Sequence, residues 1–194
     1  PCIPLGIDPP DHMKYRTMLN PHFSPKAIDA LEPKIRASAN GLIDTFIDKG
    51  TADVAYDFGR VYPVRVFMDL MGFPASRFEQ FLDWEFAILH SRDIAIATDA
   101  LRGILAYLRE FIADERAAPG PDLAGKIVTS QIGDRPITDD EIIGTMFFLW
   151  LGGLDTVAST LAMIFRRLGI DAAMQQTLRD NPDLIPSAVE ETLR

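Results

Sequence analysis

One short segment of the sequence places two glycines, an acid and an alcohol close together: Gly152, Gly153, Asp155 and Thr156. Each glycine inside a helix costs about 1 kcal/mol relative to alanine, so we expect a compensating role. Glycine leaves space for a flat ligand or a second backbone, and an acid beside a hydroxyl can open the helical hydrogen-bond ladder and hold water. Because an acid, an alcohol and a water form a proton-delivery chain, the segment is a candidate catalytic site.

A purely structural interpretation of the same segment is also open. The two glycines could serve only to let helices pack closely. Thr156 would then bond to its own helix backbone, and Asp155 would join a surface ion pair. The sequence alone does not choose between these two interpretations.

Two other pairs of residues stand at helical spacing. His12 and Arg16 are four residues apart and share a helix face, where a ring nitrogen and a cation could together bind an anion. Glu191 and Arg194 are three residues apart, the spacing at which a carboxylate meets a guanidinium. Most pairs of this kind are solvated, so each pattern is weak by itself.

Other classes of site have no pattern in the sequence. No His/Asp/Glu cluster has metal-site spacing, no glycine-rich loop has phosphate-binding spacing, and no Gly-x-Ser-x-Gly elbow occurs. The sequence therefore argues against a hydrolase and a nucleotide-binding protein, and no metal-binding residues are expected.

Charge and cysteine content narrow the partners. The chain of 194 residues has 19 Lys and Arg against 28 Asp and Glu, a net charge of -9, which disfavours binding to nucleic acid or to anionic membranes. A single cysteine, Cys2, excludes an internal disulfide and indicates a reducing compartment, so we expect a cytoplasmic protein. The most apolar run, residues 142–154, is too short to cross a bilayer and is followed by Asp155.

Helix signals continue along nearly the whole chain and predict a mainly α protein. Asp8 before two prolines and Ser24 before Pro25 are start signals, whereas residues 51–58 alternate like a short strand. Thr138 and Glu141 form a capping-box pattern for a helix of about 45 Å that runs to Leu168 with Gly169 as its cap. The expected helices cover residues 9–20, 25–50 with a break at Pro33, 61–72, 76–90, 99–116, 123–131, 138–168, 171–180 and 186–194.

The order and spacing of these motifs resemble the central part of a bacterial cytochrome P450 of the camphor-hydroxylase type. The resemblance covers essentially all 194 residues, from the C helix to the K helix, with a long central I helix, and implies one partial P450 domain over residues 1–194. The motifs that carry it are residues 8–12 with Arg16, residues 62–67, residues 133–141, residues 152–156 and residues 191–194.

The resemblance implies a haem b cofactor and roles for the candidate residues. His12 and Arg16 would bind a haem propionate, while Gly152 and Gly153 would let the helix pass over the haem face and leave room for O2. Asp155 would relay protons from solvent, and Thr156 would donate a hydrogen bond where O2 is activated. Phe148 and Leu151 would face an apolar substrate, and Glu191 with Arg194 would be structural.

One departure from the family pattern concerns the iron ligand. In the family the thiolate comes from a Phe-x-x-Gly-x-x-x-Cys-x-Gly loop well after Glu-x-x-Arg, beyond Arg194 in this numbering. Cys2 precedes the first helix and lacks that motif, so no haem ligand is expected in this chain. The family's N-terminal part is absent as well, and we expect these residues alone to be unstable without haem.

The start of the chain is its least acidic part. Residues 1–36 contain five basic and four acidic groups, a local charge of +1 within a chain of -9. In soluble P450s such a surface docks an acidic iron–sulfur ferredoxin, and Lys14, Arg16 and Lys34 are candidates for that contact here.

The resemblance implies a haem-thiolate monooxygenase that inserts one atom of O2 into a small apolar substrate. A second hypothesis keeps the fold but uses peroxide directly, in which case Asp155 and Thr156 would be unnecessary. A third is a truncated, non-catalytic helical binding module.

Overall fold

The computed structural model describes residues 2–194 and has the mainly helical fold that the sequence predicts. The helices are α1 (Asp11–Leu19), α2 (Pro25–Asp29), α3 (Glu32–Ile43), α4 (Val61–Met71), α5 (Phe78–His90), α6 (Ile94–Ala117), α7 (Leu123–Val128), α8 (Asp139–Gly153), α9 (Asp155–Ile170), α10 (Ala172–Asp180) and α11 (Ile185–Thr192). Short 3-10 turns cover Asn20–Phe23, Ile47–Lys49, Ala75–Arg77 and Pro182–Leu184, and a π-helical turn covers Val54–Gly59. An antiparallel hairpin pairs β1 (Gln131–Ile132) with β2 (Arg135–Pro136).

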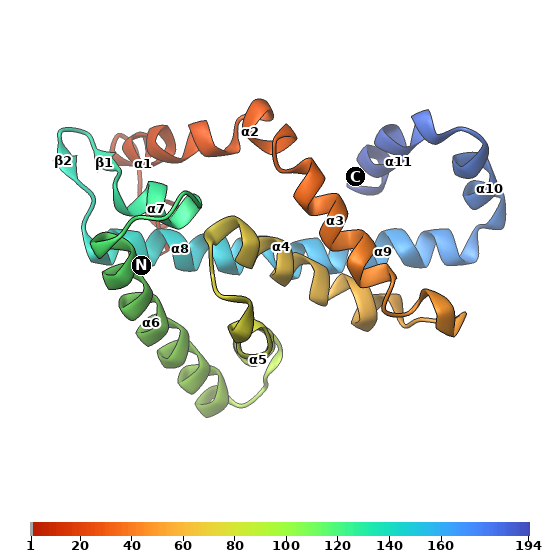
Figure 1. Cartoon of the computed structure of the whole chain (residues 1–194), viewed down its shortest axis with the longest axis horizontal. Coiled ribbons are helices and arrows are strands. Elements are labelled where there is room, and N and C mark those ends of the chain that lie inside the picture. Colours follow the sequence, from red (N-terminus) through yellow and green to blue (C-terminus); the bar gives the residue numbers. More distant parts are fainter. Residues whose placement is uncertain (1) are drawn as a thin grey trace.

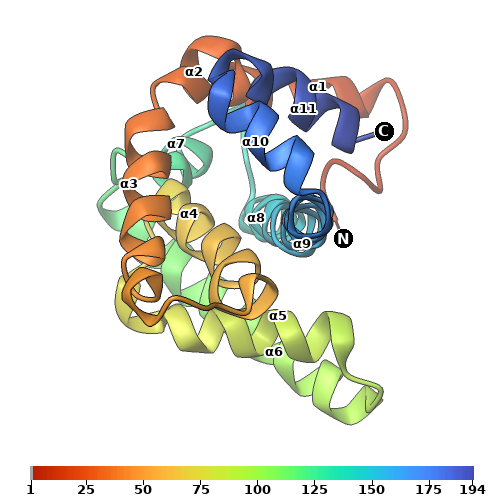
Figure 2. The same ribbon diagram turned by 90° about the vertical axis from the view of Figure 1, so that its right-hand side faces the viewer.

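The α8–α9 pair forms the long axis of the molecule, and the other elements are arranged around it (Figure 1). Viewed along this axis, the α5–α6 pair lies on one side and the α10–α11 pair on the opposite side (Figure 2). Helices α3 and α4 both lie on a third side of the axis, to the left in this view (Figure 2). The axis therefore positions every candidate catalytic residue at the centre of the fold.

The hydrophobic core lies around α8 and not around α9. Ile142, Met146 and Trp150 recur every four residues along α8 and are each at most 1% exposed, so this stripe is fully inside the core. Helix α8 packs on α4, α6 and α7, whereas α9 has no buried residue. The N-terminal half of the axis, α8, is thus held in the core, whereas the C-terminal half, α9, remains largely exposed.

The predicted long helix is interrupted, which corrects the expectation of one continuous helix over residues 138–168. Its start is confirmed, because Thr138 and Glu141 form a complete capping box. The break falls at Leu154, whose φ of -101° and ψ of -72° separate α8 from α9. Helix α9 continues to Ile170, so Gly169 lies inside it and is not a cap.

Three other local expectations were wrong. Residues 51–58 form no strand, because the Asp53 carboxylate accepts hydrogen bonds from the amides of Ala55 and Tyr56 and caps the π-helical turn. Asp8 does not cap α1, which begins at Asp11. Helix α6 begins at Ile94 and not near residue 99, because Asp93 caps it.

The α8–α9 axis, Asp139–Ile170, is long and apolar enough to cross a membrane by length and composition. This corrects the sequence argument, which counted only the shorter run over residues 142–154. Core helices of water-soluble proteins meet the same criterion, but only 11% of the apolar window is buried here, because α8 is packed into the core and α9 is not.

Candidate functional site

The candidate catalytic segment lies at the break between α8 and α9. The Thr156 hydroxyl donates a hydrogen bond to the carbonyl oxygen of Gly152 at 2.7 Å, across the residue that interrupts the helix. Asp155 is the first residue of α9, and one of its carboxylate oxygens lies 3.1 Å from His90 Nε2. The sequence expectation of a locally opened helix at this segment is confirmed.

The structure bears on both interpretations of the glycine pair. Thr156 is bonded to its own backbone and an Asp155 oxygen lies 3.1 Å from His90 Nε2, as the structural interpretation expects. That interpretation also requires the glycines to be crowded, and they are not. A Cβ added to Gly152 would meet no atom within 4 Å, and one on Gly153 would meet only Phe67 at an ordinary 3.8 Å. Packing within residues 2–194 therefore does not account for either glycine.

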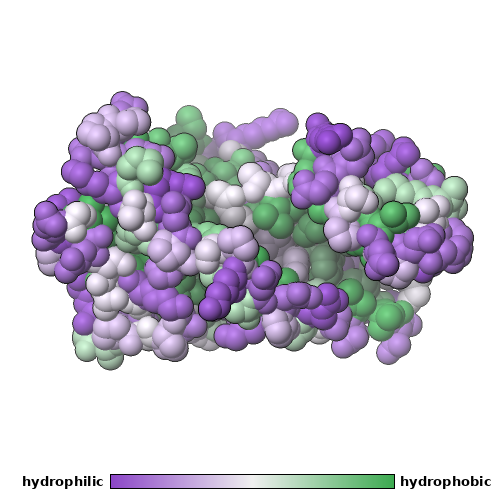
Figure 3. All heavy atoms as spheres, turned by 90° about the horizontal axis from the view of Figure 1, so that it is seen from above, coloured by the Kyte–Doolittle hydropathy of each residue, from purple (hydrophilic) through white to green (hydrophobic). Residues whose placement is uncertain are grey.

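The glycine pair borders an apolar pocket of about 510 Å³ between α3 and α4 on one side and α8 and α9 on the other. Phe148 lines this pocket, whereas Leu151 packs against the hydrophobic core instead. Seen from above, apolar residues gather in the hollowed middle of the surface between two polar ends (Figure 3). The other lining residues are Phe23, Ile35, Tyr62, Pro63, Val66, Phe67, Leu70, Leu123, Leu149 and Val157.

A second acid joins Asp155 through His90. The Glu85 carboxylate lies 3.7 Å from His90 Nε2, and its side chain is only 5% exposed. Burial raises the pKa of Glu85 above the ordinary value of 4.5, although His90 and Arg60 lower it. No sequence pattern predicts this cluster, because its members come from α5 and α9 and meet only in the folded chain.

The two candidate anion-binding residues lie on one helix, as predicted. His12 and Arg16 are one turn apart on α1, and among residues 2–194 neither side chain has an ion-pair or hydrogen-bond partner. Both ribbon views place α1 above α8 (Figures 1 and 2). A ring nitrogen and a guanidinium without protein partners suit the carboxylate of an anionic ligand.

A polar hub that sequence reasoning missed fixes α1 to the start of α8. Glu141 accepts hydrogen bonds from both terminal nitrogens of Arg135 at 2.6 and 2.8 Å, and from the Tyr15 hydroxyl at 2.6 Å. It also accepts from the amide and hydroxyl of Thr138. Arg135 and these other donors hold the pKa of Glu141 far below its usual range.

The pair at the end of the chain forms as the spacing predicts. Arg194 Nη1 lies 3.1 Å from a carboxylate oxygen of Glu191, and both side chains are exposed. An exposed pair of this kind contributes little stability. Its structural role stays a prediction.

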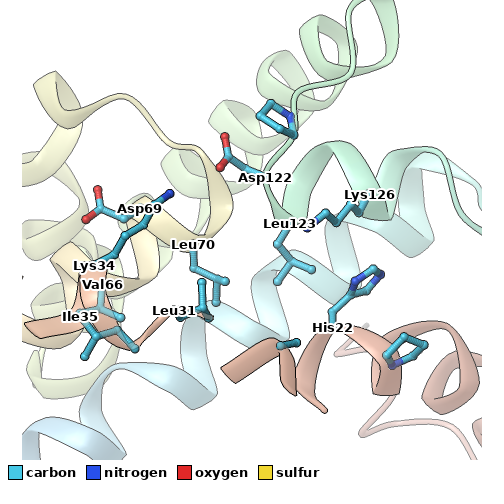
Figure 4. Close-up of a pocket in the computed structure, with 13 residues that line it drawn as sticks. His22, Leu31, Lys34, Ile35, Val66, Asp69, Leu70, Asp122, Leu123 and Lys126 are labelled. Carbon is cyan, nitrogen blue, oxygen red and sulfur yellow. The ribbon is translucent and has the colours of Figure 1, made fainter. Parts of the chain in front are cut away.

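A second groove, of about 430 Å³, lies beside the first and has charged residues at its edge. His22 and Lys126 lie near one end, and Lys34 and Asp69 lie near the other (Figure 4). Burial, with a smaller effect from Lys126, lowers the pKa of His22. Lys34, one of the candidate docking residues, is therefore accessible at the surface.

Fold and site together define a helical domain whose long axis is interrupted beside an apolar, ligand-sized pocket. No family model matches the chain. The chain is 34% identical to "Probable cytochrome P450 127A1" of Sinorhizobium fredii, over 100% of this chain and 47% of that protein. It is 33% identical to the erythromycin C-12 hydroxylase of Saccharopolyspora erythraea, over 97% of this chain and 49% of that protein.

Solved structures agree with these sequence relatives. The cytochrome P450 PksS of Bacillus subtilis superposes with a TM-score of 0.90 at 29% identity, over 96% of this chain and 48% of that one. CYP101J2 superposes with a TM-score of 0.86 at 30% identity, over 95% of this chain and 46% of that one. The chain belongs to the cytochrome P450 family, and it spans about half the length of the curated relatives it matches.

Proposed function

We propose that the protein to which this chain belongs is a haem-dependent monooxygenase acting on a small apolar substrate. The balanced reaction is RH + O2 + 2e⁻ + 2H⁺ → ROH + H2O, so it needs a source of two electrons and a path for two protons. Relatives named as hydroxylases, such as the erythromycin C-12 hydroxylase, support this reaction class.

The observation that carries the proposal is the open space at the glycine pair. A glycine in a helix is costly unless something must come close to it, and a Cβ added to Gly152 would meet no atom of residues 2–194 within 4 Å outside its own helix backbone. Gly152 and Gly153 both line the apolar pocket, and they lie directly before the break at Leu154. A flat cofactor beside the pocket accounts for both features.

The residues present fit a haem. His12 and Arg16 offer two donors without protein partners to its propionates, and Gly152 and Gly153 offer a face without side chains. Bound haem supplies the iron at which O2 is reduced, with its cysteine ligand supplied from outside this chain. Cys2 lies before α1, away from any such motif, and is not assigned that role.

Asp155 and Thr156 provide the proton path. The Asp155 carboxylate is 37% exposed, so it can exchange protons with solvent while it stands at the helix break. The Thr156 hydroxyl gives up its bond to Gly152 to donate into the open space beside the glycines. An acid at the surface followed by an alcohol at the site is the order that proton delivery requires.

The lining of the pocket supports an apolar substrate. Its lining side chains are carbon-rich, with Tyr62 the one hydroxyl among them, and it holds no charged side chain. An apolar pocket of this kind favours a small apolar organic molecule and gives little support to a charged one. Phe148, on α8 one turn before Gly152, would contact such a substrate.

The electron donor is proposed to be a ferredoxin-type iron–sulfur protein that docks on the least acidic part of the chain. Lys34 is exposed, and Lys14 is exposed beside Asp11, to which it is paired at 2.7 Å. Reversing the charge of Lys34 in the full-length enzyme should slow electron transfer and weaken its salt dependence. An unchanged salt profile would reject this docking surface.

Two glycines allow a matched test of the catalytic proposal. Gly152 and Gly169 both lie in helices, and a Cβ at either would meet no atom within 4 Å. In the full-length protein, Gly152→Val should therefore fold but lose haem content, substrate-induced spectral change and turnover, while Gly169→Val keeps all three. Wild-type haem content and turnover in Gly152→Val would contradict the proposal.

The alternative of a non-catalytic helical module makes an opposite prediction. The coding region beyond Arg194 would then lack a glycine-flanked cysteine loop, and the full-length protein would show no thiolate-type spectrum in its reduced carbon monoxide complex. Peroxide-driven turnover that is insensitive to substitution of Thr156 would favour the other alternative, an enzyme of the same fold that uses peroxide directly.

We place the protein in the cytoplasm, on its single free cysteine and its acidic composition.

A further inference from the structure

The strongest cluster outside the proposed haem site is the group Glu85, His90 and Asp155. One ligand atom from each side chain lies within 4.8 Å of the other two. His90 Nε2 is 3.1 Å from an Asp155 oxygen and 3.7 Å from a Glu85 oxygen. Two ligands of a tetrahedral zinc ion lie about 3.3 Å apart, from metal–ligand distances of about 2.0–2.1 Å. The two measured distances bracket that separation.

The buried carboxylate of Glu85 has an oxygen without a hydrogen-bond partner among residues 2–194, which indicates that the cluster could bind a cation. The Glu85 side chain is only 5% exposed, and Oε1 is the oxygen that lies 3.7 Å from His90 Nε2. The other oxygen of the same carboxylate, Oε2, is buried and has no hydrogen-bond partner among residues 2–194. A buried carboxylate oxygen without a partner is costly, and a bound cation would offset that cost. The proposal rests on this buried orphan oxygen together with the distances, and not on the presence of acids alone.

The surroundings favour a cation, and the charged groups around it are few. From α5 come Glu85 and His90, from α9 comes Asp155, and from the segment before α4 comes Arg60, whose guanidinium stacks on the Phe86 ring at 5.1 Å. Two carboxylates outweigh this one guanidinium. His90 and Asp155 are 44% and 37% exposed, so an ion can enter from solvent.

We propose that Glu85, His90 and Asp155 form a site for a divalent transition metal of the zinc class, which clamps the end of α5 to the break between α8 and α9. One imidazole and two carboxylates suit zinc better than calcium or magnesium, which prefer all-oxygen ligands. A fourth position stays open to water on the exposed side.

Metal binding has a consequence for the proposed monooxygenase. A zinc ion on the Asp155 carboxylate withholds that oxygen from proton transfer, so zinc should inhibit turnover. This consequence rests on the proposed function, whereas the binding site itself does not.

The test uses the full-length, haem-loaded protein after chelation and dialysis. Zinc chloride is titrated by calorimetry, and bound zinc is counted by mass spectrometry after equilibrium dialysis. We expect one zinc per chain, with at least tenfold weaker binding in His90→Gln and in Glu85→Gln, each of which keeps the size of the side chain. His22→Gln is the control, because His22 lies in the second groove and its loss should leave zinc affinity unchanged.

The outcomes separate the site from the function. Equal zinc affinity in wild type, His90→Gln and Glu85→Gln, or no stoichiometric binding, overturns the metal site whatever the enzyme does. The second measurement is the ratio of turnover with zinc to turnover without it, which should be low in wild type and near one in His90→Gln. Stoichiometric binding with no inhibition keeps the metal site and overturns the role of Asp155 in proton delivery.

Discussion

The Thr156 hydroxyl is bonded to the carbonyl oxygen of Gly152, one turn earlier, at 2.7 Å. This bond spans the break at Leu154, so the hydroxyl satisfies a carbonyl that the interrupted ladder leaves free. The same group is the proposed donor in the oxygen site. In the absence of ligand, the bond to Gly152 therefore holds the Thr156 hydroxyl close to the proposed oxygen site.

Replacing Thr156 by valine tests that dual role. Valine keeps the shape but removes the donor, so electrons should continue to be consumed while product per electron falls at least about tenfold, since positioned proton donors contribute roughly 10²-fold or more. Thr160 is the matched control, because its hydroxyl makes the same bond to Thr156 at 2.8 Å one turn later. Product yield and reductant use are measured together. An unchanged product yield per electron in Thr156→Val, or an equal loss of that yield in Thr160→Val, would contradict the assignment.

Glu141→Gln should destabilise the full-length protein by about 2 kcal/mol at pH 7, because a mostly buried carboxylate and its charge-assisted hydrogen bonds are lost. The folded-state pKa of Glu141 lies below the ordinary 4.5, so its contribution is complete above pH 4.5 and falls as the pH drops below that value. Denaturant unfolding at pH 7 and pH 3 should show the difference between wild type and variant shrinking in acid. Glu32→Gln, in an exposed pair with Arg36, should change little at either pH.

Two glycines should respond to alanine in opposite directions. A Cβ on Gly125 would overlap the backbone of Gly120, so Gly125→Ala should cost at least about 2 kcal/mol, as overpacking against a backbone does. Gly41, inside α3, has nothing within 4 Å of an added Cβ, so Gly41→Ala should stabilise by about 0.5–1 kcal/mol. Thermal melts of both variants check the pair. A stable Gly125→Ala protein would mean that the loop before α7 lies farther away.

Tyr107→Phe should leave stability unchanged or raise it by about 1 kcal/mol, because the Tyr107 hydroxyl is buried without a hydrogen-bond partner among residues 2–194. Burial raises the pKa of Tyr107 to about 12, so the phenol stays neutral and the effect should be constant between pH 5 and pH 9. Tyr15→Phe is the contrasting variant, since its hydroxyl donates to Glu141 at 2.6 Å and its loss should destabilise. Chemical denaturation across this pH range compares the two; a loss in Tyr107→Phe would reveal a partner for its hydroxyl.

Sequence patterns correctly predicted helix ends that are determined by residues close to them in the sequence. The capping box of Thr138 and Glu141 and the end of α4 at Gly72, whose φ is +78°, are decided within a few residues and were predicted correctly. Residues 51–58 were misread, because their alternation suits a strand and the cap by Asp53 favours a helical turn instead.

The candidate site was predicted in part for the same reason. The glycine pair, Asp155 and Thr156 are adjacent in sequence, so their chemistry was visible before the fold. Glu85 lies 70 residues before Asp155, and the two acids meet around His90 only in the folded chain, which no local pattern reports. The family resemblance implied that Leu151 faces the substrate; Leu151 packs partly buried against the core, and its contact with substrate stays a prediction.

The break at Leu154 also divides the central axis into two helices that should differ in how readily they unfold locally. Helix α8 is held by Ile142, Met146 and Trp150, so its amides should exchange with deuterium only when the whole core opens. Helix α9 has no buried residue among those described and no continuous ladder to α8, so it should open by itself. Contacts that other parts of the full-length protein make with α9 would therefore control the rigidity of Asp155 and Thr156. They would leave the packing of α8 in the core unchanged.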